Sequence, residues 1–141
     1  MIAYLDTSAV LPLLIDEPAS ILCRQVWSTA HSVTTTRLLY VEAAAALARA
    51  ARLGRLDPSE HERSLAGLDT LWLQFDVLAV DDELVRSAAT LATTRGLRGY
   101  DAVHCASALE VNGPTVVAVS GDRVLLEAWR ASGVDVIDTT A

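Results

Sequence analysis

Four acidic residues interrupt apolar or helical segments of the chain: Asp6, Glu42, Asp101 and Asp122. Asp6 directly follows the apolar run 2–5, and Asp122 comes shortly after the apolar run 116–119. Because ligands of parallel α/β sheets bind at the carboxyl ends of the strands, these two acids meet if their strands are neighbours. Clustered carboxylates repel one another unless a cation neutralises them, and Mg²⁺ or Mn²⁺ is the usual partner of oxygen ligands. An ion held in this way can activate water for attack on a phosphodiester.

Each of these acids also has a structural interpretation. Asp6, Asp101 and Asp122 precede or begin expected helices, where aspartate commonly caps the free backbone N–H groups. Glu42 lies beside an alanine-rich stripe, from which it could extend into solvent or pair with Arg49 two turns along. The pattern alone therefore leaves capping and ion pairing open beside a metal site.

The segments that carry these acids alternate between strand and helix patterns. Strands are predicted over residues 2–5, 32–35, 75–80, 115–119 and 134–137, and the strand at 75–80 is expected to be buried. Helices are predicted over residues 8–15, 18–27, 37–53, 58–73, 83–95, 100–111 and 123–131, with Asp57 capping the fourth. This alternation predicts an α/β fold, a three-layer α/β/α sandwich with a central parallel sheet, in one domain spanning residues 1–141.

The composition is that of a globular protein, because 52% of the 141 residues are hydrophobic and only 21% are charged. The longest stretch without a charged residue, 25–36, is too short and too polar for a membrane-spanning helix. The N-terminal residues lack a basic region and read as a first strand, so we expect a cytoplasmic location. Cys23 and Cys105 have no metal-site spacing and are expected to be reduced core thiols.

The charge balance limits the ways in which this chain can bind nucleic acid. Eleven basic residues, all of them arginine, stand against 18 acidic ones and give a net charge of −7. A broad basic footprint for phosphates is therefore absent. The absence of lysine also excludes Walker-type phosphate loops and Schiff-base chemistry. Any contact with RNA must be local, and Arg123, next to Asp122, is the first choice for it.

The segments around the four acids resemble the PIN-domain ribonucleases, in particular the VapC-type toxins of bacterial toxin–antitoxin modules. The segment 4–9 (YLDTSA) is similar to the start of that family, and Glu42 within 40–44 (YVEAA) is similar to its helical glutamate. The segments 100–108 (YDAVHCASA) and 119–123 (VSGDR) are similar to the two remaining acidic motifs, although Ser120 stands where threonine is commoner. The resemblance covers essentially the whole chain.

This resemblance implies a function and a site. Four acids, Asp6, Glu42, Asp101 and Asp122, would converge on one or two Mg²⁺ or Mn²⁺ ions, and metal-activated water would cleave RNA. Ser8 and Ser120 would hold the carboxylates through their hydroxyl groups. The implied partners are a cognate antitoxin, whose arm lies across the acidic pocket, and a second copy of the chain in a homodimer.

Other possibilities stay open at the level of sequence. His104 lies one helical turn after Asp101, so the two could form a metal-binding pair, although a histidine in an apolar helix is more often a packed residue. An aspartyl-phosphate enzyme would use Asp6 as the nucleophile, but it calls for a further acid two residues on, where this chain has Ser8. A catalytically inactive binding module of the same fold would be expected to have lost at least one acid, and all four are present.

Overall fold

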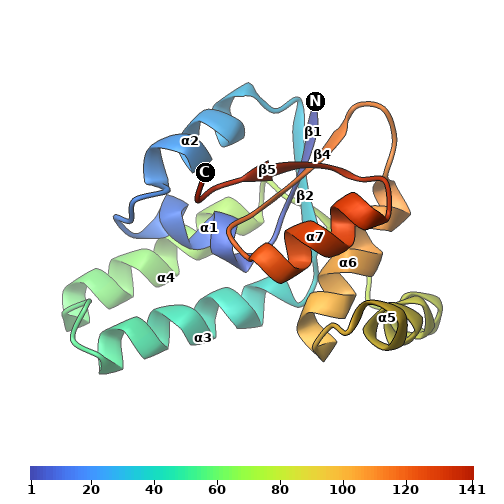
Figure 1. Cartoon of the computed structure of the whole chain (residues 1–141). Helices are drawn as coiled ribbons and strands as arrows, with labels where there is room; N and C mark the ends of the chain where they lie inside the picture. The colour runs from blue at the N-terminus through green and yellow to red at the C-terminus, as the bar shows by residue number, and fades with distance from the viewer.

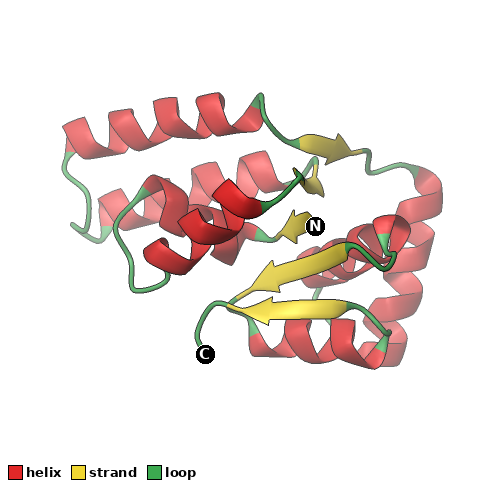
Figure 2. Ribbon diagram, turned by 90° about the horizontal axis from the view of Figure 1, so that it is seen from above, coloured by secondary structure: helices red, strands yellow, loops and turns green.

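The computed structural model describes all 141 residues and has a parallel five-stranded sheet at its centre (Figure 1). The strands, β1 (Ile2–Leu5), β2 (Ser32–Thr36), β3 (Asp76–Leu78), β4 (Val116–Ser120) and β5 (Asp135–Asp138), lie in the order β3-β2-β1-β4-β5. Every neighbouring pair is parallel. In Figure 2 the C-terminus follows a strand that lies beside another one, and these are β5 and β4. The predicted parallel α/β fold is therefore confirmed.

Seven helices cover the two faces of this sheet. They are α1 (Thr7–Leu14), α2 (Ser20–Thr29), α3 (Leu39–Arg52), α4 (Pro58–Trp72), α5 (Asp82–Arg95), α6 (Gly99–Val111) and α7 (Arg123–Ala131). In Figure 1, α1 to α4 lie on the left of the sheet and α5 to α7 on the right. The result is the predicted sandwich of three layers. Asp6, Glu42 and Asp122 lie at or near junctions between a strand and a helix, and Asp101 follows the connection between α5 and α6.

Two separate hydrophobic cores follow from this layering, and the central strand β1 contributes to both. Ala3 and Leu5 face the core formed with α1 to α4, and Tyr4 faces the core formed with α5 to α7. Successive side chains of a strand point to opposite faces of a sheet, so this alternation is what a central strand requires. Tyr4 thus places a polar hydroxyl in an otherwise apolar layer.

Most predicted element boundaries agree with the structure to within two residues, and one strand differs in kind. Residues 75–80 were predicted to form a buried strand, but only Asp76–Leu78 pair, and Asp76 is exposed. The reason is that β3 lies at the edge of the sheet and has β2 as its one neighbour. Asp57 caps α4 as predicted, with its side chain accepting from the Glu60 backbone N–H in a capping box.

Both cysteines are buried free thiols, one in each core, as predicted. Burial raises the pKa of Cys23 and of Cys105 to about 11, so neither is a reactive thiolate at neutral pH. None of the helices has the length and apolar character that crossing a membrane requires.

Candidate active site

Asp6 lies buried at the carboxyl end of β1, where it also caps α1. Its Oδ1 accepts from the Ser8 hydroxyl at 2.7 Å and from the Ala9 backbone N–H at 3.3 Å. Its Oδ2 accepts from the Ser120 hydroxyl at 2.9 Å. The carboxylate is therefore held by donors from both sides. The capping interpretation of Asp6 is correct, and its role as a metal ligand stays a prediction.

The electrostatic setting of Asp6 opposes its negative charge. Burial raises the pKa of Asp6 above its ordinary value, and this effect outweighs the nearby His104 ring and the donated hydrogen bonds, which lower it. No arginine or histidine side chain lies within ion-pair distance of this carboxylate. A buried carboxylate without an ion-pair partner is costly unless a cation compensates it, which makes Asp6 a suitable ligand for one.

Ser8 and Ser120 connect Asp6 to the loop between β4 and α7. Ser120 Oγ accepts from the Asp122 backbone N–H at 2.9 Å, and Ser8 Oγ accepts from the Gly121 backbone N–H at 2.8 Å. The two hydroxyl oxygens lie 3.3 Å apart. Because each hydroxyl has one hydrogen and directs it to Asp6, this contact between the two serines is packing. Both predicted serines lie where they can orient the carboxylate.

Gly121 brings the loop close enough for these bonds to form. A Cβ atom at this position would lie 2.8 Å from Thr139 Oγ1, nearer than real Cβ atoms approach. Thr139 follows β5 and donates its backbone N–H to the Ser120 carbonyl oxygen at 2.9 Å. The loop is thus enclosed by Ser8 and by the residues that follow the last strand.

Asp122 caps α7 through a bond from the Leu125 backbone N–H to its Oδ1 at 3.2 Å. Its neighbour Arg123 is 88% exposed and lies 3.7 Å from Glu127 in a weak surface pair. The guanidinium of Arg123 is therefore free to contact another group beside the acidic loop.

Glu42 belongs to the first turn of α3 and reaches across to α6. Its Oε1 lies 2.8 Å from His104 Nε2, and the alternative pair with Arg49 is not formed. The other ring nitrogen, Nδ1, lies 2.8 Å from the Tyr4 hydroxyl. The Tyr4 hydroxyl is also close enough to Asp6 and Glu42 that, after the effect of burial, their negative charges help to raise its pKa. Asp6 and Glu42 therefore flank the same buried pair of rings.

Asp101 lies in the first turn of α6, one turn before His104, and it caps nothing. Arg98 precedes the helix there without a side-chain capping bond, so the capping interpretation was wrong for Asp101. Arg98 Nε contacts Asp101 Oδ2 at 3.3 Å. The Arg98 side chain is 85% exposed and Asp101 is 17% exposed, so this ion pair is weak and can open.

The donor set fits a hard divalent cation in kind, because it consists of carboxylates. No three side chains of the types that ligate metals are close enough to hold an ion as they stand. Each acid instead has its own partner: serine hydroxyls for Asp6, His104 for Glu42, Arg98 for Asp101 and the Leu125 backbone N–H for Asp122. Four carboxylates with no thiolate among them favour Mg²⁺ or Mn²⁺ over softer metals.

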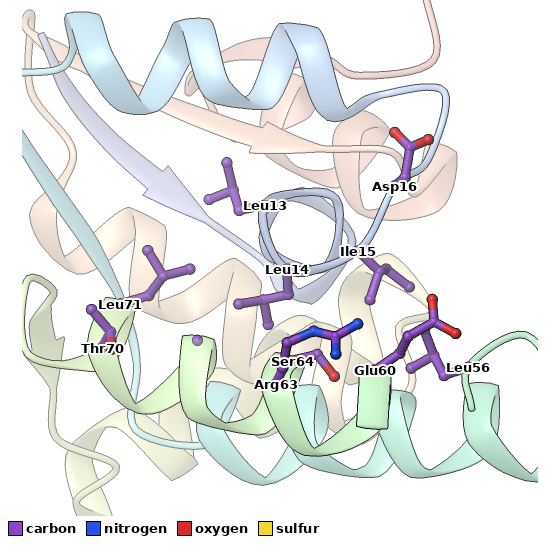
Figure 3. A pocket seen from close by; sticks show the side chains of 11 residues that line it. Leu13, Leu14, Ile15, Asp16, Leu56, Glu60, Arg63, Ser64, Thr70 and Leu71 are labelled. Atoms are coloured by element: carbon purple, nitrogen blue, oxygen red, sulfur yellow. The ribbon is translucent and has the colours of Figure 1, made fainter. Parts of the chain in front are cut away.

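One cavity of the molecule lies away from these acids. Figure 3 shows it between the C-terminal part of α1 and helix α4, with Leu14 and Leu71 on its apolar side and Arg63 among its polar residues. Its volume is about 480 Å³. Asp6 lies at the opposite end of α1, so this cavity is separate from the acidic cluster.

Comparison with known families decides which fold family this is. The family model of the PIN domain matches residues 3–128. The chain belongs to the PIN-domain family. Among curated proteins, this PIN domain is 36% identical over 132 residues to ribonuclease VapC45 of Mycobacterium tuberculosis, covering 94% of this chain and 92% of the relative.

Solved structures agree with this assignment. The crystal structure of PAE2754 from Pyrobaculum aerophilum has a TM-score of 0.67 and 29% identity, covering 99% of this chain and 93% of that one. A toxin–antitoxin complex from Klebsiella pneumoniae has a TM-score of 0.63 at 13% identity and 97% coverage of both chains, which supports the fold of the PIN domain.

Two residues of the site, Tyr4 and His104, were not assigned to it from the sequence. Tyr4 occurs in an apolar strand, where tyrosine is a common packing residue, so its spacing gave no signal. His104 was weighed as a metal-binding partner of Asp101, and the structure shows a buried ring bonded to Tyr4 and Glu42. The one available signal was its position a single turn after Asp101.

Proposed function

We propose that this chain is a Mg²⁺- or Mn²⁺-dependent endoribonuclease that acts as the toxin of a toxin–antitoxin pair. The observation that carries the proposal is a pair of hydrogen-bonded networks near the carboxyl ends of the central strands. One joins Asp6 through Ser120 to the backbone of Asp122, and the other holds Glu42 on His104. The family of the chain and the ribonuclease name of its 36% identical relative support the same activity.

The four acids have distinct roles in this proposal. Asp6 and Asp101 have short side chains on rigid elements and hold the cation directly. Glu42 completes the ligand set from α3, and Asp122 contributes more weakly or through water, because its Oδ1 also caps α7. Bound Mg²⁺ or Mn²⁺ would supply activated water and neutralise charge on the phosphodiester.

Binding of RNA is local in this proposal, because the chain has a net charge of −7. Arg123 is exposed beside the acidic loop and can contact a phosphate there. Arg98 can do the same once Asp101 binds the cation and releases the guanidinium. Affinity should therefore depend on the divalent ion and only weakly on monovalent salt.

The proposed partners follow from the same acidic cluster. An antitoxin arm that presents an arginine or lysine would find in the four carboxylates a site for its cation. We also propose a homodimer and a cytoplasmic location, as the resemblance to VapC-type toxins implies. Co-purification with the product of the neighbouring reading frame, followed by loss of cleavage, tests the antitoxin.

The alternative of an aspartyl-phosphate enzyme is disfavoured by the surroundings of Asp6. Both oxygens of its carboxylate accept hydrogen bonds from serine hydroxyls, and the side chain is buried. Such an enzyme also calls for a further acid two residues on, where this chain has Ser8, or for a downstream lysine, and the chain has none. An inactive binding module remains the competing outcome of the experiment below.

The test compares cation binding and cleavage in the same samples. We expect Mn²⁺ and Mg²⁺ to raise the melting temperature of the wild type, because a cation relieves the repulsion among the carboxylates. A mixed RNA should be cleaved with either ion and left intact in EDTA. Cation binding without cleavage would identify an inactive module, and equal melting curves in Mg²⁺ and EDTA would remove the metal site.

A further inference from the structure

A continuous line of three polar side chains crosses the interior, and it joins three elements. Tyr4 comes from β1, His104 from α6 and Glu42 from α3. The Tyr4 hydroxyl lies 2.8 Å from His104 Nδ1, and His104 Nε2 lies 2.8 Å from Glu42 Oε1. Tyr4 and His104 are buried, whereas the side chain of Glu42 is 20% exposed. The line therefore begins in the core and ends at the candidate active site.

The hydrogens along this line can be assigned from donors and acceptors. A tyrosine hydroxyl carries its proton at neutral pH, so Tyr4 can donate a hydrogen bond. If this O–H donates to His104 Nδ1, the one hydrogen of the neutral ring must lie on Nε2. The opposite tautomer would place the lone pair of Nε2 against a carboxylate oxygen, which is repulsive. A protonated ring also carries Nε2–H, so the bond to Glu42 is the same in either state.

The position of His104 on α6 connects two of the acids expected to bind the cation. Asp101 lies one turn earlier on the same helix, so α6 carries one expected ligand and also the ring that holds another. Glutamate has three rotatable bonds and loses rotamer entropy when it is fixed. Glu42 is partly exposed, so water can solvate its carboxylate. The ring of His104 could likewise bond to water or to a backbone group. The need of each side chain for a hydrogen-bond partner therefore does not by itself explain their contact.

We infer that Tyr4 and His104 are positioning residues for Glu42: the Tyr4 hydroxyl helps to set the His104 tautomer, and the ring Nε2–H holds Glu42 Oε1, which would leave Oε2 available to hold a cation. The inference rests on the proposed function and goes beyond it, because it assigns two residues that do not touch the substrate. Hydrogen bonds to a ligating carboxylate commonly change metal affinity or activity by 10- to 100-fold.

The first measurement needs neither a cation nor activity. In protein with ¹⁵N-labelled histidine, long-range ¹H–¹⁵N spectra identify which ring nitrogen carries the hydrogen, and the His104→Gln variant assigns the signal of His104 against those of His31 and His61. We expect a hydrogen on Nε2 in the wild type and a smaller fraction of this tautomer in Tyr4→Phe, where Glu42 alone favours it. A hydrogen on Nδ1 alone in the wild type would overturn the inference.

The second measurement is binding of Mn²⁺ alone by calorimetry, with circular dichroism on the same samples. His104→Leu should weaken binding by about 10- to 100-fold. His104→Gln keeps an N–H donor and should recover most of this loss, and the exposed His31→Leu serves as the control without effect. Equal Mn²⁺ affinity in folded His104→Leu and wild type would overturn the inference.

A double-variant comparison separates positioning from a general loss of structure. In a Glu42→Gln background, His104→Leu should cause no further loss of Mn²⁺ affinity, because both changes act through one contact. Independent losses would assign His104 a structural role only. If the wild type binds no Mn²⁺ and cleaves no RNA, the proposed function fails, whereas the tautomer spectra still decide whether Tyr4 directs the ring.

Discussion

Asp6 and Glu42 are held by different kinds of hydrogen-bond donor, small hydroxyl groups for Asp6 and a buried ring for Glu42. Asp6 receives bonds from two serine hydroxyls, which are small and can rotate, and one of them is only two residues away in the chain. Glu42 receives one bond from His104, 62 residues away, and Tyr4 restricts the rotation of that ring. A short carboxylate on a buried strand end needs only small donors nearby, whereas a long one needs a rigid partner to limit its motion.

This difference determines how much the loss of one donor should affect each carboxylate. When one serine is lost, Asp6 still has the other serine and the Ala9 backbone N–H as donors. When His104 is lost, Glu42 has no other hydrogen-bond donor from the protein. Loss of one serine should therefore weaken the positioning of Asp6 only in part, whereas loss of His104 should remove the positioning of Glu42 completely.

The largest effect is expected from Asp6→Asn. We expect a fall in cleavage of about 1,000-fold or more, because a ligating charge contributes several kcal/mol and each ~1.4 kcal/mol is tenfold in rate. Asparagine caps helices as well as aspartate does, so circular dichroism should show a folded protein. A folded and fully active Asp6→Asn would contradict the metal site.

Glu42→Gln should reduce cleavage by about 100-fold, somewhat less than Asp6→Asn, because the amide oxygen can still accept from His104 and keep its place. The increase in melting temperature caused by Mg²⁺ should shrink in parallel. Arg49→Gln, on the same helix but without contact to Glu42, is the matched control and should leave both quantities unchanged.

Ser120→Ala tests the partial effect expected from the loss of one serine. The change removes one donor from Asp6 and the acceptor of the Asp122 backbone N–H, so we expect about 1–3 kcal/mol of lost stability. Cleavage should fall only about tenfold, because Ser8 still donates to Asp6. Ser28→Ala, at an exposed position, provides the control. A loss as large as that of Asp6→Asn would show that the two serines act as one unit.

The smallest expected effect is on the pH dependence of stability without metal. Because the folded pKa of Asp6 is raised, the folded state keeps a proton that the unfolded state has lost. The free energy of unfolding should therefore fall as the pH rises from the ordinary carboxyl range through the folded pKa. Asp6→Asn should flatten this slope in chemical denaturation at several pH values. An unchanged slope would mean that Asp6 is not strained by burial.

The positions of the acids could be predicted from the sequence because they depend on local patterns. Asp6 and Asp122 follow apolar strands, and the carboxyl ends of neighbouring parallel strands come together. The partner of Glu42 could not be predicted, because Arg49 lies on the same helix, whereas His104 meets Glu42 only through the packing of α6 beside β2 and α3. The edge position of β3 likewise depends on strand order, which its residues do not encode locally.

The close approach at Gly121 links the end of the chain to the chemistry. Thr139 fixes the Ser120 carbonyl from behind, and position 121 has no space for a side chain between Thr139 and Ser8. The residues after β5 therefore support the loop between β4 and α7. Cleavage of the chain or a bulky substitution after β5 should let this loop move away from Asp6, although all four acids are still present. A protein damaged there would keep its full set of catalytic side chains and still lose their alignment.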